Sequence, residues 1–163
     1  MVSIDEHLEI VGDSVGDALE EALAVAEKQV FFLKMLKHFS LKSSQRQPVT
    51  APLKNIGVTT KSIGVYLYIH NGKVMSVGQG RIYNRIRRFN KVFSNGGIPD
   101  ADSHYHTAVK CFEYDPNVDN WQVEAIVIPG DDDVAKHLAG YIEVELQERY
   151  NPPFSDIKMA GKG

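Results

Sequence analysis

The chain has 163 residues, of which 43% are hydrophobic and 24% charged. These values are typical of one globular domain and exclude a disordered, collagen-like or disulfide-built chain. Cys111 is the single cysteine, so no internal disulfide can form. The longest nearly unbroken apolar stretch, residues 30–36, is far shorter than the roughly 20 residues that cross a bilayer. With no signal-peptide pattern at the start, we expect a cytoplasmic protein without a membrane partner.

The net charge of −3 is the sum of three blocks of opposite sign. Residues 1–27 carry eight acidic side chains and no Lys or Arg, whereas residues 28–99 carry thirteen Lys or Arg and no acidic side chain. Residues 100–163 carry thirteen acidic side chains against five basic ones. The central block indicates an anionic partner such as nucleic acid. The alternative is that the acidic ends fold back onto the basic middle, in which case residues 1–27 would weaken DNA binding.

The predicted elements begin with a helical segment over residues 1–40. Its apolar residues recur at three-, four- and seven-residue steps, which is the spacing of an amphipathic helix, and Gly12 and Gly16 can divide it in two. Such a segment is suited to bind a second copy of the chain or another protein, so a homo-oligomer is one hypothesis. Residues 41–62, rich in Ser, Gln, Pro, Thr and Lys, predict a linker or arm that leads into a domain over residues 63–163.

Residues 63–80 predict a β-hairpin, because two β-rich runs flank Asn71-Gly72, the strongest short-range turn signal. Two-residue and three-residue loops sort the side chains differently, and we prefer a three-residue loop with a bulge at Gly72 because it separates apolar from polar side chains more cleanly. One face then holds Val65, Leu67, Ile69, Met75 and Val77. The other face holds Tyr66, Tyr68, Val74 and Ser76, so Tyr66 and Ser76 are expected on the same side.

A helix is predicted after the turn at Gly78-Gln79-Gly80. An apolar stripe at steps of i, i+4 and i+7 is expected to pack on the sheet, and a stripe of guanidinium groups runs beside it. The apolar stripe consists of Ile82, Ile86 and Phe89, and the arginine stripe of Arg81, Arg85 and Arg88. The following residues 90–120 are irregular and polar, although residues 107–113 are compatible with a short strand.

A third strand is predicted over residues 121–128, and a last helix follows it. Asp131, Asp132 and Asp133 supply the N-cap and first-turn acids of that helix, which runs to about Tyr150 and ends before Pro152-Pro153. The predicted fold is therefore α/β (α+β), with a three-stranded, mainly antiparallel sheet flanked by helices and an N-terminal helical extension.

This order of elements resembles the GIY-YIG nuclease superfamily over residues 63–155. The first family motif is similar to Gly64-Val65-Tyr66, and the second survives as Ser76-Val77-Gly78. The arginine that the family places on its first helix falls on Arg85. Counting back eight residues from Asn151-Pro152 places the family's glutamate at Glu143.

The resemblance implies a metal-dependent DNA endonuclease. Tyr66 would orient or deprotonate the attacking water, and Arg85 would hold the scissile phosphate with its planar guanidinium. Glu143 would bind one divalent cation, Mg²⁺ or Mn²⁺, with waters completing the coordination. Ser76 stands where the family has tyrosine or lysine and could only donate a hydrogen bond. Glu145 competes with Glu143, because it lies nearer the middle of the apolar stripe of the last helix.

Other residues are candidates for contacts to DNA. His104 or His106 would replace the histidine or tyrosine that the family places one helical turn after its arginine, where this chain has Phe89. The remaining candidates are Lys73, Arg81, Arg87, Arg88 and Lys91. Because Ser76 and Phe89 depart from the family pattern, and Ser155 replaces its asparagine, a catalytically degenerate DNA-binding module is the alternative function.

Overall fold

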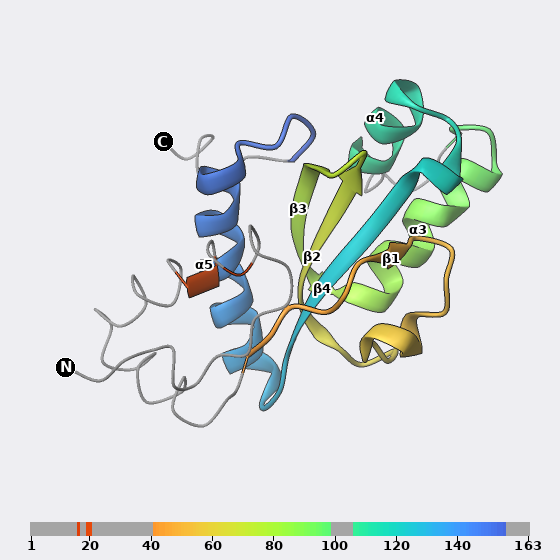
Figure 1. Ribbon diagram of the computed structural model, residues 1–163. Coiled ribbons are helices and arrows are strands. Elements are labelled where there is room, and N and C mark those ends of the chain that lie inside the picture. The colour runs from red at the N-terminus through yellow and green to blue at the C-terminus, as the bar shows by residue number, and fades with distance from the viewer. Residues whose placement is uncertain (1–15, 17–18, 21–40, 99–105, 156–163) are drawn as a thin grey trace.

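The computed structural model describes residues 16, 19–20, 41–98 and 106–155. Most of the predicted helical segment over residues 1–40, the hypothesis of an oligomer contact there, and His104 lie outside the described residues. Gly16, Leu19 and Glu20 are helical, as predicted, and Leu19 is fully buried in the domain core. The described part of the chain has an α+β fold in which helices cover both faces of one sheet (Figure 1).

The sheet of the described residues is antiparallel and has four strands in the order β1-β4-β2-β3. Strands β2 (Ile63–His70) and β3 (Lys73–Arg81) form the predicted hairpin, and β4 (Trp121–Ile128) pairs with the other edge of β2. The prediction of three strands is wrong by one, because β1 (Gln47–Pro48) pairs with the outer edge of β4. A two-residue strand that ends in proline suits a sheet edge, where no further backbone donor is needed.

Of the two predictions for residues 41–62, a linker or an arm, the contacts with β4 favour the arm, and we call this segment the arm. Ser44 N–H donates to the Ala125 carbonyl at 2.7 Å, and Val49 N–H donates to the Trp121 carbonyl at 3.2 Å. Leu41 and Val49 are buried, and a short 3₁₀ helix, η2 (Leu53–Ile56), follows. The polar sequence of the segment did not predict its contacts with β4, because only isolated apolar residues of the segment are buried there.

The hairpin turn consists of Asn71 and Gly72 alone, with φ of 49° and 78°. Positive φ at both central residues is what a two-residue type I′ turn requires, so the preference for a three-residue loop is wrong. The register instead shifts further along the hairpin, where Tyr68 pairs with Ser76 but Ile69 pairs with Val74, leaving Met75 as the extra residue of a bulge. Val74 and Met75 therefore exchange their predicted faces, whereas Ser76 stays on the side of Tyr66.

Three α-helices pack on this sheet in the described residues. Figure 1 shows α5 (Asp132–Tyr150) on one face and α3 (Ile82–Ser94) and α4 (His106–Tyr114) on the other. The predicted stripe Ile82, Ile86 and Phe89 is fully buried. The alternative of a strand over residues 107–113 is wrong, because Ala108 and Cys111 are spaced to form the buried side of a helix.

The last helix begins and ends as predicted. Asp131 caps it by accepting a hydrogen bond from Asp133 N–H at 2.9 Å, which satisfies one of the unpaired donors of the first turn. At the other end Asn151 adopts the left-handed conformation, with φ of 45°, and the two prolines follow. In the described part of the chain, no helix is both long and apolar enough to cross a membrane.

Candidate functional site

A cavity of about 380 Å³ brings together side chains from five elements of the fold. Because β3 is the terminal strand of the sheet, a residue of α5 can reach this cavity past the strand's outer edge. Six residues singled out from the sequence line it together. They are Tyr66 of β2, Ser76 of β3, Arg85 and Arg88 of α3, His106 of α4 and Glu143 of α5.

Tyr66 owes its position to the glycine opposite it. Tyr66 pairs with Gly78 of β3, and the Tyr66 ring lies where a side chain at position 78 would be. A Cβ atom added to Gly78 would lie 2.5 Å from Cζ of Tyr66, which is far inside van der Waals contact. A side chain at position 78 would thus require the Tyr66 ring to move.

Tyr68 is a further residue of the cavity that the motif comparison did not select. Its hydroxyl donates to the Arg85 carbonyl at 3.4 Å, and its ring stacks on Phe89 with 4.0 Å between centroids. Burial raises the pKa of Tyr68 well above its usual value, and the nearby Tyr66 adds to the shift. Tyr68 is therefore a neutral phenol that supports α3, and alternation along β2 was the signal that placed it beside Tyr66.

Arg85 is half-buried and lies beside Gly80 of β3. Gly80 has φ of 129°, a conformation that favours glycine, and a Cβ atom there would be in ordinary contact with Nε of Arg85 at 3.5 Å. Arg88 follows about one turn later and lines the same cavity. Phe89 is only 1% exposed and also stacks on Phe93, so it forms the apolar floor of the site and offers no polar group.

Glu143 and Glu145 occupy different environments. Glu143 is 8% exposed and lines the cavity. Glu145 is half-buried outside the cavity lining, beside Tyr141, whose pKa is raised by burial and then by the negative charge of Glu145. Of the two carboxylates that the sequence left open, Glu143 is therefore the one that faces Tyr66 and Arg85 across the site.

The residues of the cavity that could hold a metal ion are few. Within the described residues, no group of three or more His, Cys, Asp or Glu side chains is placed to hold an ion. One buried carboxylate with water-accessible space beside it suits Mg²⁺, which keeps several waters and binds through one or two carboxylates. Burial raises the pKa of Cys111 to about 12, so this thiol stays protonated and does not add a soft ligand.

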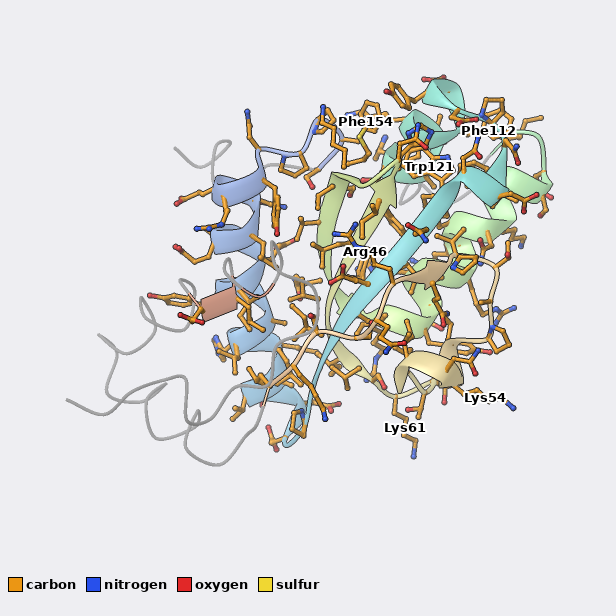
Figure 2. All side chains as sticks on the ribbon, viewed as in Figure 1. Arg46, Lys54, Lys61, Phe112, Trp121 and Phe154 are labelled. Atoms are coloured by element: carbon orange, nitrogen blue, oxygen red, sulfur yellow. The ribbon has the colours of Figure 1, made fainter. Side chains whose placement is uncertain are left out.

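The chain beyond α5 holds the outer edge of β3. Val77 N–H donates to Ser155 Oγ at 2.6 Å, and Ser155 Oγ in turn donates to the Val77 carbonyl at 3.1 Å, which also accepts from Gln147 Nε2 at 3.1 Å. Phe154, labelled in Figure 2, donates its N–H to the Met75 carbonyl at 3.0 Å. Its ring contacts Tyr114 of α4 with 5.6 Å between centroids. These contacts fix the strand that carries Ser76 and close a sheet edge that would otherwise be unpaired.

The other DNA-binding candidates lie outside the cavity. Lys73 is exposed beside the hairpin turn, and Arg81 forms an exposed ion pair with Asp132 at 3.4 Å. Arg87 and Lys91 line a second cavity, which Arg88 also lines.

Comparison with known proteins gives no match to any protein-family model, curated protein or solved structure.

Proposed function

We propose that the chain is a metal-dependent DNA endonuclease of the GIY-YIG type that hydrolyses phosphodiester bonds. The observation that carries the proposal is the convergence of Tyr66, Arg85 and Glu143 on one cavity from three separate elements. Their residue types match the needs of the reaction, which are a group that positions water, a cation for the phosphate and a carboxylate for a metal ion.

Each residue has a defined task in this proposal. Arg85 binds the scissile phosphate through its planar guanidinium and so favours the negative charge that grows in the transition state. Tyr66 holds the attacking water by its hydroxyl and accepts or relays the proton. Glu143 binds Mg²⁺ or Mn²⁺, which supplies Lewis-acid charge at the phosphate oxygens when bound.

His106 takes the place of the polar group that Phe89 cannot provide. It is exposed, begins α4 and lines the same cavity as Arg85. Its imidazole is a group that can donate a proton to the departing oxygen. Ser76 is 2% exposed and contributes at most a hydrogen bond from its hydroxyl.

A DNA-binding module without catalysis is the second candidate function. The observation that favours it is the chemistry at two positions of the cavity, where Ser76 lacks a phenol and Phe89 lacks any polar group. Arg85 and Arg88 would still bind phosphates in such a module, because guanidinium groups recognise phosphate without any reaction.

Replacing Arg85 separates these two functions. For the enzyme we expect wild-type protein to nick supercoiled plasmid with Mg²⁺ but not with EDTA, and Arg85→Ala to lower the cutting rate by about 10²–10³-fold. In contrast, Arg85→Ala should weaken DNA binding only through the loss of one phosphate contact. This loss reduces the slope of log affinity against log salt by about 1.

Arg149→Ala is the matched control, because Arg149 is exposed on α5 away from the cavity lining. It should cut DNA at the wild-type rate. A wild-type protein that binds DNA with this salt dependence but never cuts it would establish the binding module and contradict the enzyme.

A further inference from the structure

A second and larger cavity lies on the other side of α3. It has a volume of about 690 Å³, within the range of cavities that hold ligands. One wall is α3, which contributes Arg87, Arg88 and Lys91, and another includes Thr50 of the arm. We call this cavity the α3 groove.

The α3 groove is built by packing and is not a gap between loops. Asn90 Nδ2 donates to the Val49 carbonyl at 2.8 Å, which ties the arm to the middle of α3. Phe93, which also lines the groove, is buried and packs against Trp121 and Phe112. The lining of the groove is thus held by the same core that supports the candidate site.

The charge of the α3 groove is of one sign. Two arginines and one lysine line it, and no carboxylate belongs to its described lining. Two acidic residues, Asp115 and Asp119, adjoin lining residues along the chain, but neither belongs to the described lining. The Asp115 carboxylate accepts hydrogen bonds from His70 at 2.7 Å and Asn120 at 2.8 Å. Such a groove favours an anion.

Arg88 links the α3 groove to the candidate site, because it lines both cavities. Arg85 faces the site, and Arg87 and Lys91 face the groove, so basic side chains follow α3 from one cavity to the other. A ligand with regularly repeated negative charges can occupy both cavities at once, whereas a single small anion fills one. A nucleic-acid backbone is such a ligand.

We propose that the α3 groove binds the phosphodiester backbone of the same DNA that enters the candidate site, at a point away from the reacting phosphate. The inference rests on the proposed function, since it takes DNA as the substrate of that site. Arg87 and Lys91 hold the flanking backbone, and Arg88 lies between the two phosphate contacts. The groove thereby sets how far the substrate must extend on one side of the reacting bond.

The test compares two double variants that remove the same charge. Arg87→Ala/Lys91→Ala removes two exposed cations of the groove, and Lys54→Ala/Lys61→Ala removes two exposed cations elsewhere. Figure 2 shows Lys54 and Lys61 extending away from the sheet at the end opposite Phe112. Affinity for a fluorescein-labelled DNA duplex is measured by anisotropy over a series of salt concentrations in EDTA, so that no cutting occurs.

We expect the groove variant to reduce the slope of log affinity against log salt by about 2, one for each lost phosphate contact. The control variant should change the slope by less than half of that and cut plasmid like the wild type. Equal slopes for the two double variants would overturn the proposal.

A parallel titration with inorganic phosphate distinguishes a free anion from a DNA backbone. Saturable phosphate binding that the groove variant loses, without a change in the DNA slope, would assign the groove to a small anion and also overturn the proposal. Because binding is measured in EDTA, the outcome does not depend on catalysis. If the groove variant reduces the salt slope as expected but the wild-type protein never cuts DNA, the proposal for the α3 groove stands and the proposed endonuclease activity is wrong.

Discussion

At the scale of single residues, Tyr66 and Gly78 form a close contact across the hairpin. The ring of Tyr66 crosses the strand opposite it, and only a residue without a Cβ atom leaves space there. The motifs could be found in the sequence, but their contact could not, because it depends on the register of the hairpin. That register shifts at Met75, which the turn residues alone do not indicate.

Replacing this glycine should therefore damage the site more than the fold. We expect Gly78→Ala to cost about 1–3 kcal/mol of unfolding free energy through overpacking. The cutting rate should fall by about 10²-fold, because a displaced Tyr66 no longer aligns the water.

The measurements are urea unfolding and plasmid nicking. Gly140→Ala is the control, since Gly140 lies in α5 with no atom within 4 Å of an added Cβ, and it should be neutral or stabilising by about 0.5–1 kcal/mol. Full activity of Gly78→Ala would contradict the placement of Tyr66.

Glu124 is a buried carboxylate on the opposite face of the sheet, and it makes folding pH-dependent. It is 1% exposed and pairs with Arg46 of the arm at 2.5 Å, while the side chain of Arg46, labelled in Figure 2, remains 31% exposed. Burial raises the pKa of Glu124 and outweighs the opposing effect of Arg46. The folded protein thus holds the Glu124 proton more tightly than the unfolded chain does. The protonated carboxyl therefore stabilises the fold at pH values below the usual glutamate pKa, and this stabilisation is lost as pH rises through the pKa of Glu124 in the folded protein.

We expect Glu124→Gln to remove this pH dependence. The melting temperature of the variant relative to wild type should increase between about pH 4 and about pH 8, because only the wild type must bury a charge as the carboxyl ionises. This difference is measured by thermal unfolding of the wild type and of Glu124→Gln at several pH values across this range. A difference that is constant, or that decreases with pH, would contradict the assigned direction of the shift.

At the scale of elements, periodic segments were predictable and edge segments were not. The stripe Ile82, Ile86 and Phe89 has helical spacing, and the acids at the start of α5 mark its N-terminus, so both helices were found from sequence. The short strand β1 has no such period, because its role is to pair with one edge of β4. Residues 107–113 were ambiguous because the segment is short and only two of its residues, Ala108 and Cys111, are buried in α4.

The segment after α5 is a second edge segment that the sequence did not reveal, and Ser155 is its main contact. We expect Ser155→Ala to cost about 1–3 kcal/mol, because a buried backbone N–H of Val77 loses its acceptor. Urea unfolding of this variant beside Ser94→Ala, an exposed serine of α3, measures the cost. Equal stability of the two variants would show that Ser155 does not hold β3.

At the scale of the whole molecule, α3 carries four of the thirteen basic residues of the central block. Arg85 and Arg88 line the candidate site, and Arg87 and Lys91 line the α3 groove, so one helix presents cations to two cavities. The sequence predicted the anionic partner from charge, and the resemblance selected Tyr66, Arg85 and Glu143. The cavity that these residues line and the α3 groove both depend on how distant elements pack. Neither charge nor residue spacing in the sequence predicts that packing.

The central claim is that this cavity hydrolyses DNA with the help of the Glu143 carboxylate. The most direct test is the single-turnover rate of nicking of supercoiled plasmid in Mg²⁺ by wild type, Glu143→Gln and Glu145→Gln, two variants of matched shape on the same helix. We predict that Glu143→Gln lowers the rate by at least about 10²-fold through loss of the metal ligand, while Glu145→Gln nicks like the wild type. Nicking by Glu143→Gln at the wild-type rate, or no Mg²⁺-dependent nicking by the wild type, would contradict the claim.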